Sequence, residues 1–347
     1  MKIGKLDTAS LGRPIIVAEM SANHLGRLER ALEIIDAAAG SGADALKIQT
    51  YRADTITIRS DRPEFRIRGG LWDGRSLYDL YEEGTTPWEW IPALIERGRK
   101  NGLEVFSSPF DAGAAAVLEK NGVPAFKIAS FELVDLGLIR AVSAYRKPVI
   151  MSDGLASLSE IDRAVNAARQ GGASGIAVLH CVSSYPADPR DYHLSDIPFL
   201  KEHFGGTVSV GLSDHTRGTD VAVAATAMGA EVIEKHFTMR RADGGLDAAF
   251  SLEPQEFSAL RKGVETAASA IGSVHFRKDD EVLPGMKFRR SLYLVKSVKK
   301  GDKATPENIR SIRPAAGLDP ALYDSLIGRT FSADFAGGVP LSLSMFD

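Results

Sequence analysis

The stretch VSVGLSDHTRGTDVAVAATAMGAEVIEKHFT, residues 208–238, contains one complete unit of a repeating pattern. An apolar, β-branched run at 208–214 ends in polar residues, and a helical pattern follows at 219–230. The helical pattern ends near a glycine, as helices often do. A second apolar run at 231–238 again ends in polar residues. This order predicts a strand, a helix and a second, parallel strand.

The same pattern recurs along most of the chain. Apolar runs lie at 15–20, 45–50, 104–110, 125–130, 148–153, 175–182, 208–214 and 231–238, with helical patterns at 28–43, 112–123, 157–172 and 219–230 between them. Eight strands alternating with helices predict a (β/α)8 TIM barrel, whose usual size is about 250 residues. A doubly wound open sheet is the alternative, but AEMSANHLG after the first run is not the Gly-rich loop typical of that fold.

Composition narrows the classes of function. The 347 residues are 44% hydrophobic and 25% charged, as in folded proteins, and the length favours one large and one small domain. A net charge of −3 without a long basic run argues against nucleic acid or an anionic membrane as partner. There is no membrane-length apolar run and no signal-peptide core, so we expect a cytoplasmic protein in which Cys181 is a packed thiol.

The apolar runs share a polar C-terminal end. The C-terminal ends of barrel strands converge on one face, where the active sites of this fold lie. The polar residues at these ends are Glu19, Lys47, Gln49, Ser107, Ser108, Lys127, Ser130, Ser152, Asp153, Ser183, Tyr185, Ser213 and Glu234. We therefore expect one polar pocket at that face.

Two histidines end the seventh and eighth runs. His215 and His236 should lie on neighbouring strands, close enough to share a divalent metal ion. The alternative is that each histidine caps its strand through a hydrogen bond. No third His or Cys follows nearby, which favours an open, partly hydrated site suited to Lewis-acid chemistry over a structural zinc site. The role of His24 stays open, and the remaining histidines are expected to be structural.

Two lysines lie where a structural barrel would have aliphatic residues. Lys47 and Lys127 come late in the second and fourth runs, so their burial needs an anion nearby. Together with the surrounding hydroxyl groups, they predict a small, doubly anionic ligand. The alternative is that the lysines pair with Glu19, Glu132 or Glu234 without any ligand.

Several ordered motifs resemble the sialic acid synthase family, in which a sugar aldehyde condenses with phosphoenolpyruvate. They are AEMSANHLG, LKIQTY, SSPFD, KIASFE, LHCVSSYP, GLSDHTRG and EKHFT. The segments SLYDLYEEGTTPWEW (76–90) and RADGGLDAAFSLEP (241–254) are similar to the pseudaminic acid synthase branch of that family. From residue 284 onward the chain resembles the family's SAF, or antifreeze-like, domain. The expected domains are a TIM barrel (1–275), a linker (276–285) and a SAF domain (286–347).

The resemblance implies a role for each matching position. His215 and His236 match the metal pair, commonly for manganese, with magnesium or cobalt as alternatives. Positions that line the phosphoenolpyruvate site are Lys47, Lys127, Ser108, Ser130, Ser152, Ser183 and Ser213. Positions near the sugar or the reacting centre are Glu19, Gln49, Glu132, Tyr185 and Asp247. The chain departs from the neuraminate synthases at Ser183, where they often have Asn.

The implied reaction joins phosphoenolpyruvate to 2,4-diacetamido-2,4,6-trideoxy-altrose, giving a nine-carbon 2-keto acid and phosphate by C–O cleavage. Glu19 or Glu132 is the expected base for the attacking water, and a role in orienting a lysine is the alternative. Arg313 matches an arginine that reaches across a domain-swapped homodimer to the sugar's N-acyl group, although an ordinary surface arginine is the alternative. Other possible functions are an N-acetylneuraminate or legionaminate synthase, a carbohydrate-binding protein and, on fold grounds alone, a metal-dependent aldolase or a seven-carbon keto-acid synthase.

Overall fold

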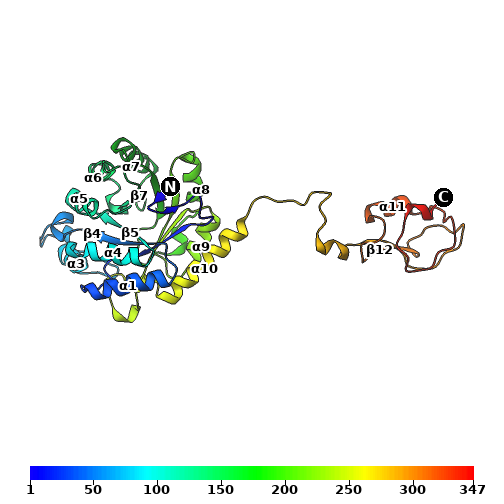
Figure 1. The fold of residues 1–347 in the computed structure, drawn as a ribbon, viewed down its shortest axis with the longest axis horizontal. Helices are drawn as coiled ribbons and strands as arrows, with labels where there is room; N and C mark the ends of the chain where they lie inside the picture. The colour runs from blue at the N-terminus through cyan, green and yellow to red at the C-terminus, as the bar shows by residue number, and fades with distance from the viewer. The chain divides into compact units, whose positions relative to one another are not determined.

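Eight parallel strands close into a barrel in the computed structural model, which describes residues 1–347 (Figure 1). In barrel order they are β3 (Ile15–Glu19), β4 (Ala45–Thr50), β5 (Glu104–Pro109), β6 (Phe126–Ile128), β7 (Val149–Ser152), β8 (Ile176–Cys181), β9 (Ser209–Asp214) and β10 (Val232–His236). β10 pairs with β3 and completes the closure. The predicted TIM barrel is confirmed, and each strand lies within one of the predicted apolar runs.

Helices surround the barrel (Figure 1). They are α1 (Leu28–Gly40), α4 (Ile91–Lys100), α5 (Ala112–Lys120), α6 (Leu136–Ser143), α7 (Leu158–Gly171), α8 (Asp196–His203), α9 (Asp220–Ala227) and α10 (Pro254–Ile271). Two short helices, α2 (Ala53–Ile56) and α3 (Leu77–Gly84), lie between β4 and α4. The first turns of α5 and α6 are capped by Asp111 and Asp135, whose carboxylates accept hydrogen bonds from backbone N–H groups at 2.8 and 3.0 Å.

Strand alternation divides the barrel side chains between two cores. Ile16, Leu46 and Ile233 face the helices, whereas Val17 and Val232 belong to the core that fills the barrel interior. Because side chains alternate along a strand, Glu19 shares the inward face with Val17, and Glu234 and His236 share it with Val232. The lower part of the interior is therefore apolar, and polar side chains follow toward the C-terminal strand ends.

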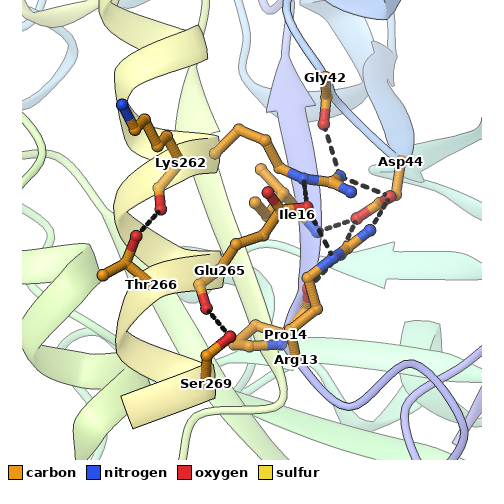
Figure 2. A network of polar contacts seen from close by, with 10 residues as sticks. Arg13, Pro14, Ile16, Gly42, Asp44, Lys262, Glu265, Thr266 and Ser269 are labelled. Atoms are coloured by element: carbon orange, nitrogen blue, oxygen red, sulfur yellow. Dashed lines mark hydrogen bonds and ion pairs between the residues drawn. The ribbon is translucent and has the colours of Figure 1, made fainter.

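An unpredicted hairpin packs against the barrel's interior core. β1 (Lys2–Ile3) and β2 (Leu6–Asp7) are antiparallel, and Ile3 is fully buried in that core. At the N-terminal ends of β3 and β4, Arg13 donates two hydrogen bonds to Asp44 at 2.7 and 2.8 Å (Figure 2). Arg261 of α10 donates to the same carboxylate at 2.9 Å. This end of the barrel is thus closed by packing and ion pairs, in keeping with the structural role of that face in the fold.

The chain divides into two compact units, Met1–Gly272 and Ser273–Asp347. The second unit contains β11 (Ser291–Leu294), antiparallel to β12 (Ile309–Ile312), and the short helix α11 (Tyr323–Leu326). Its own small core includes Leu292, Leu294, Ile309, Leu326, Phe331 and Leu341. None of the helices combines the length and the apolar character that crossing a membrane would need.

Candidate active site

Four buried charged side chains meet inside the upper barrel. Lys47 Nζ lies 2.7 Å from Glu19 Oε2 and 3.6 Å from Glu234 Oε1. Lys127 Nζ donates hydrogen bonds to both carboxylate oxygens of Glu234, each at 3.1 Å. The pairing of the lysines with carboxylates, which the sequence left as the alternative to an anionic ligand, is present for Glu19 and Glu234, whereas Glu132 pairs with neither lysine.

Burial and charge oppose each other in this cluster. Burial disfavours the charged form of Lys47, but Glu19 and Glu234 outweigh this effect and raise the pKa of Lys47. Burial raises the pKa of Glu19 despite the attraction of Lys47, and burial lowers the pKa of Lys127. Burial would also raise the pKa of Glu234, but Lys127 and Lys47 outweigh burial and lower it. Glu19 is therefore the carboxylate that most readily takes up a proton, which would leave the cluster with net positive charge.

Hydroxyl groups surround the ionic cluster. Ser213 donates to Glu234 at 3.2 Å, and Lys47 Nζ is 3.5 Å from the hydroxyl of Ser108. Ser152 is 3% exposed, and its Oγ has no hydrogen-bond partner in the protein. Since buried polar atoms are normally satisfied, the free hydroxyl of Ser152 is available to a bound molecule or water. A further pair of hydroxyls, Ser130 and Ser183, lies 2.7 Å apart.

The two histidines lie next to each other at the ends of β9 and β10. The ring centroids of His215 and His236 are 5.4 Å apart. His215 Nδ1 lies 2.8 Å from the carbonyl oxygen of Val182, to which it donates in the neutral tautomer, so Nε2 carries the lone pair. His236 Nδ1 is buried without a hydrogen-bond partner, so this ring does not cap its strand. Burial lowers the pKa of His215 to about 4 and that of His236 well below its usual range, which keeps both imidazoles neutral.

Neutral imidazoles are the form that binds divalent transition metals, so this pair fits such an ion. Asp247 Oδ2 is 3.8 Å from His236 Nδ1, and burial raises the pKa of Asp247. No group of three or more His, Cys, Asp or Glu side chains converges in the structure as a metal site. Two imidazole nitrogens would leave the other coordination positions of such an ion to substrate or water.

A cavity of about 360 Å³ connects His236 with further predicted residues. Gln49, Glu132, Ser183, Tyr185, His236 and Asp247 are among its lining residues. Burial raises the pKa of Glu132 to about 7, and its Oε2 atom has no hydrogen-bond partner. The ring of Tyr185 lies 4.5 Å from that of His215, and Gln49 donates to Glu19 at 3.0 Å. A carboxyl group with a pKa near neutrality in a cavity is suited to general acid–base catalysis.

The structure thus brings together all the predicted site residues except one. Arg313 lies in the second unit, directly after β12, where its side chain is exposed. His24, whose role the sequence left open, is buried and lies 3.1 Å from Thr86 Oγ1, outside the cavity lining.

Two residues of the site were given no catalytic or binding role from the sequence. Glu234 was named only as a polar strand end and a possible ion-pair partner, although it precedes His236 by two positions and must share its face of β10. Tyr192 lies below the site, where its hydroxyl accepts from the backbone N–H of His215 at 2.7 Å and donates to the carbonyl of Ser213 at 3.1 Å. No sequence pattern connects Tyr192 to the histidines.

Comparison with known proteins identifies the family. The NeuB family model matches residues 34–276, and the SAF domain model matches residues 289–347. A Campylobacter jejuni protein named pseudaminic acid synthase is 42% identical over 346 residues, which cover 100% of both chains. An N,N'-diacetyllegionaminic acid synthase from the same species is 32% identical, over 93% of this chain and 97% of that protein. The crystal structure of a Leptospira borgpetersenii N-acetylneuraminic acid synthetase, 31% identical, superposes with a TM-score of 0.71 and covers 81% of this chain and 92% of that one. This chain therefore belongs to the NeuB family and ends in a SAF domain.

Proposed function

We propose that this protein has pseudaminic acid synthase activity. It condenses phosphoenolpyruvate with 2,4-diacetamido-2,4,6-trideoxy-altrose and releases phosphate and a nine-carbon 2-keto acid. The observation that carries the proposal is the buried Lys–Glu cluster beside two neutral histidines in one barrel mouth. The full-length similarity to a pseudaminic acid synthase, greater than that to the legionaminic acid synthase, supports the choice of sugar.

Phosphoenolpyruvate binds at the ionic cluster. Its phosphate and carboxylate take charge-assisted hydrogen bonds from Lys47 and Lys127. The free hydroxyl of Ser152 donates to the same anion. The other hydroxyl groups at this subsite belong to Ser108, Ser130, Ser183 and Ser213.

The sugar aldehyde lies beside His215 and His236. These two imidazoles would hold a divalent cation, manganese or alternatively magnesium or cobalt, which polarises the aldehyde oxygen when bound. Gln49, Tyr185 and Asp247 orient the open-chain sugar through hydrogen bonds and ring contact.

Carbon 3 of phosphoenolpyruvate attacks the aldehyde carbon, and positive character develops at carbon 2. The carboxylate of Glu234 stabilises this charge, and Glu132 accepts a proton from the water that adds to carbon 2. Glu19 is the second candidate for that base. The tetrahedral adduct then expels phosphate, so the C–O bond breaks and the P–O bond stays intact.

The proposal extends to the assembly. The barrel (1–275), a linker (276–285) and the SAF domain (286–347) form a cytoplasmic, domain-swapped homodimer. In it, the exposed Arg313 reaches the sugar's N-acyl group in the barrel of the other subunit.

The decisive experiment measures phosphate release from phosphoenolpyruvate with a panel of acylated sugars, before and after chelation. The trideoxy sugar should give the highest kcat/KM, and chelation should abolish turnover until Mn²⁺ is restored. Phosphoenolpyruvate labelled with ¹⁸O in the bridging position should deliver the label to phosphate. Full activity after exhaustive chelation, or label retained in the keto acid, would contradict the proposed chemistry.

A further inference from the structure

The cavity beside His236 is lined by two chemically different groups of residues. One group consists of the polar residues of the candidate active site. The other is aliphatic and aromatic and comes from the segment between β4 and α4: Ile56, Ile67, Trp72, Leu77 and Leu80. Leu80 is 8% exposed. We call these five residues the apolar wall.

The apolar wall is tied to the barrel by specific contacts. Trp72 Nε1 donates to the carbonyl of Leu246 at 3.1 Å, and its ring lies 5.8 Å from that of Tyr185. Backbone hydrogen bonds of 2.9 and 3.0 Å join Ile67 to Arg75 and Gly74, so the chain folds back on itself before α3. The wall is therefore a built part of the cavity.

The orientation of an open-chain sugar follows from the position of its reacting end. Under the proposed function the aldehyde, carbon 1, lies beside His236 and Glu132, among the polar residues of the lining. Carbons 4 to 6 are the far end of the chain, so they extend away from the histidines. The remaining lining of the same cavity includes the apolar wall.

We propose that the apolar wall is the specificity subsite for the far end of the sugar, and this inference rests on the proposed function. Its aliphatic side chains contact the methyl group at carbon 6 and the acetamido methyl at carbon 4. The side chains of Ile56, Ile67, Leu77 and Leu80 carry no hydrogen-bond donor or acceptor, and the indole N–H of Trp72 is already used. A hydroxyl at carbon 6 would lose its water without gaining a partner, which penalises the 6-hydroxy sugar.

The test compares kcat/KM for the 2,4-diacetamido-2,4,6-trideoxy sugar with kcat/KM for its 6-hydroxy counterpart. We expect the wild-type protein to prefer the deoxy sugar by roughly 10- to 200-fold, the range for apolar pockets that discriminate single groups. Ile67→Asn and Leu77→Asn, at half-buried positions, should each lower this ratio at least about tenfold by offering the hydroxyl a partner. The KM for phosphoenolpyruvate should not change.

Ile58→Asn is the matched control, because Ile58 lies in the same segment but is 61% exposed and does not line the cavity. It should leave the ratio unchanged, and Leu77→Met should retain the wild-type preference. If the wild-type protein turns over the two sugars with nearly equal kcat/KM, the proposal is overturned without any variant. It is also overturned if both Asn variants fold and keep the wild-type ratio of the two kcat/KM values. Turnover of neither sugar by the wild-type protein would instead refute the proposed function, on which this subsite rests.

Discussion

Lys235 Nζ lies 2.8 Å from Asp214 Oδ2, and both side chains are completely excluded from solvent. Asp214 precedes His215 at the end of β9, and Lys235 precedes His236 on β10. Strand alternation directs this ion pair to the helix side of the barrel, opposite to Glu234 and His236. The pair therefore joins, from behind, the two strands that carry the histidines.

Lys235→Met should lower the free energy of unfolding by about 3–5 kcal/mol, since it leaves Asp214 buried and unpaired. Adding Asp214→Asn should recover part of the loss, because the neutral amide can still accept the hydrogen bonds that Thr216 donates to this side chain. Urea unfolding followed by circular dichroism measures both effects. Lys100→Met, in an exposed pair with Glu96, is the control and should leave the midpoint unchanged. A Lys235→Met midpoint equal to that of the wild type would contradict the prediction.

Ser152→Ala should raise the KM for phosphoenolpyruvate without lowering stability. Its hydroxyl makes no hydrogen bond within the protein, so the variant loses only the hydrogen bond to the anion. That bond is worth about 1.5–3 kcal/mol, which corresponds to an increase in KM of roughly 10- to 150-fold. Ser107→Ala on β5 is the contrast, since Ser107 donates to the carbonyl of Ile48 at 3.0 Å and lies 2.8 Å from Thr50 Oγ1. That variant should be less stable by about 1 kcal/mol with an unaltered KM. Steady-state kinetics and thermal unfolding separate the two outcomes, and an unaltered KM in Ser152→Ala would remove this serine from the anion site.

Glu132 should govern the pH dependence of turnover. As a general base it acts when ionised, so kcat should rise with pH through about 7, the pKa to which burial raises this carboxyl. Glu132→Gln should abolish this rising limb and lower kcat by roughly 10²- to 10⁴-fold. If kcat of Glu132→Gln still rises with pH through about 7, another residue is the base, and Glu19 is the next candidate.

The same carboxyl should affect stability with a defined sign. Its folded-state pKa lies above the ordinary value of 4.5, so the folded protein binds the proton more tightly than the unfolded chain. The stabilisation is full below pH 4.5 and is lost as the pH rises to about 7. Glu132→Gln should therefore gain stability relative to the wild type across this window, measured by urea unfolding at pH 4.5 and 8. A stability difference that does not change with pH would mean that the carboxyl titrates normally.

Arg313→Ala should weaken sugar binding or turnover by about 1–3 kcal/mol, as expected for a charge-assisted hydrogen bond, and should leave the dimer intact. Mixing this variant with His236→Ala should restore activity. A mixed dimer contains one barrel with both histidines, served by Arg313 of the partner subunit. Mixing Arg313→Ala with an Arg313→Ala/His236→Ala double variant is the control and should give no rescue. If subunit exchange is verified and activity does not return in the first mixture, Arg313 does not act across the dimer.

The sequence by itself determined that the chain folds into a barrel and which residues lie on the polar face of that barrel. The β-branched runs and the glycines that end the helices locate the strands within a few residues. Period-two alternation then places Lys47, Glu234 and His236 inside the barrel, because a closed parallel barrel allows only two directions for a strand side chain. Polar residues at the strand ends follow the same rule, so their gathering at one face of the barrel could be predicted without knowledge of any long-range contact.

Only the tertiary structure decided which of these groups pair and what charge they carry. Lys127 and Glu234 are 107 residues apart, and they meet because β6 and β10 lie across the interior from each other. The pKa of Glu132 depends on how deeply the folded chain buries it. Tyr192 reaches His215 from a loop that has no sequence periodicity. Such contacts arise from the closure of the barrel and the exclusion of water inside it, which are properties of the assembled fold and not of any local stretch.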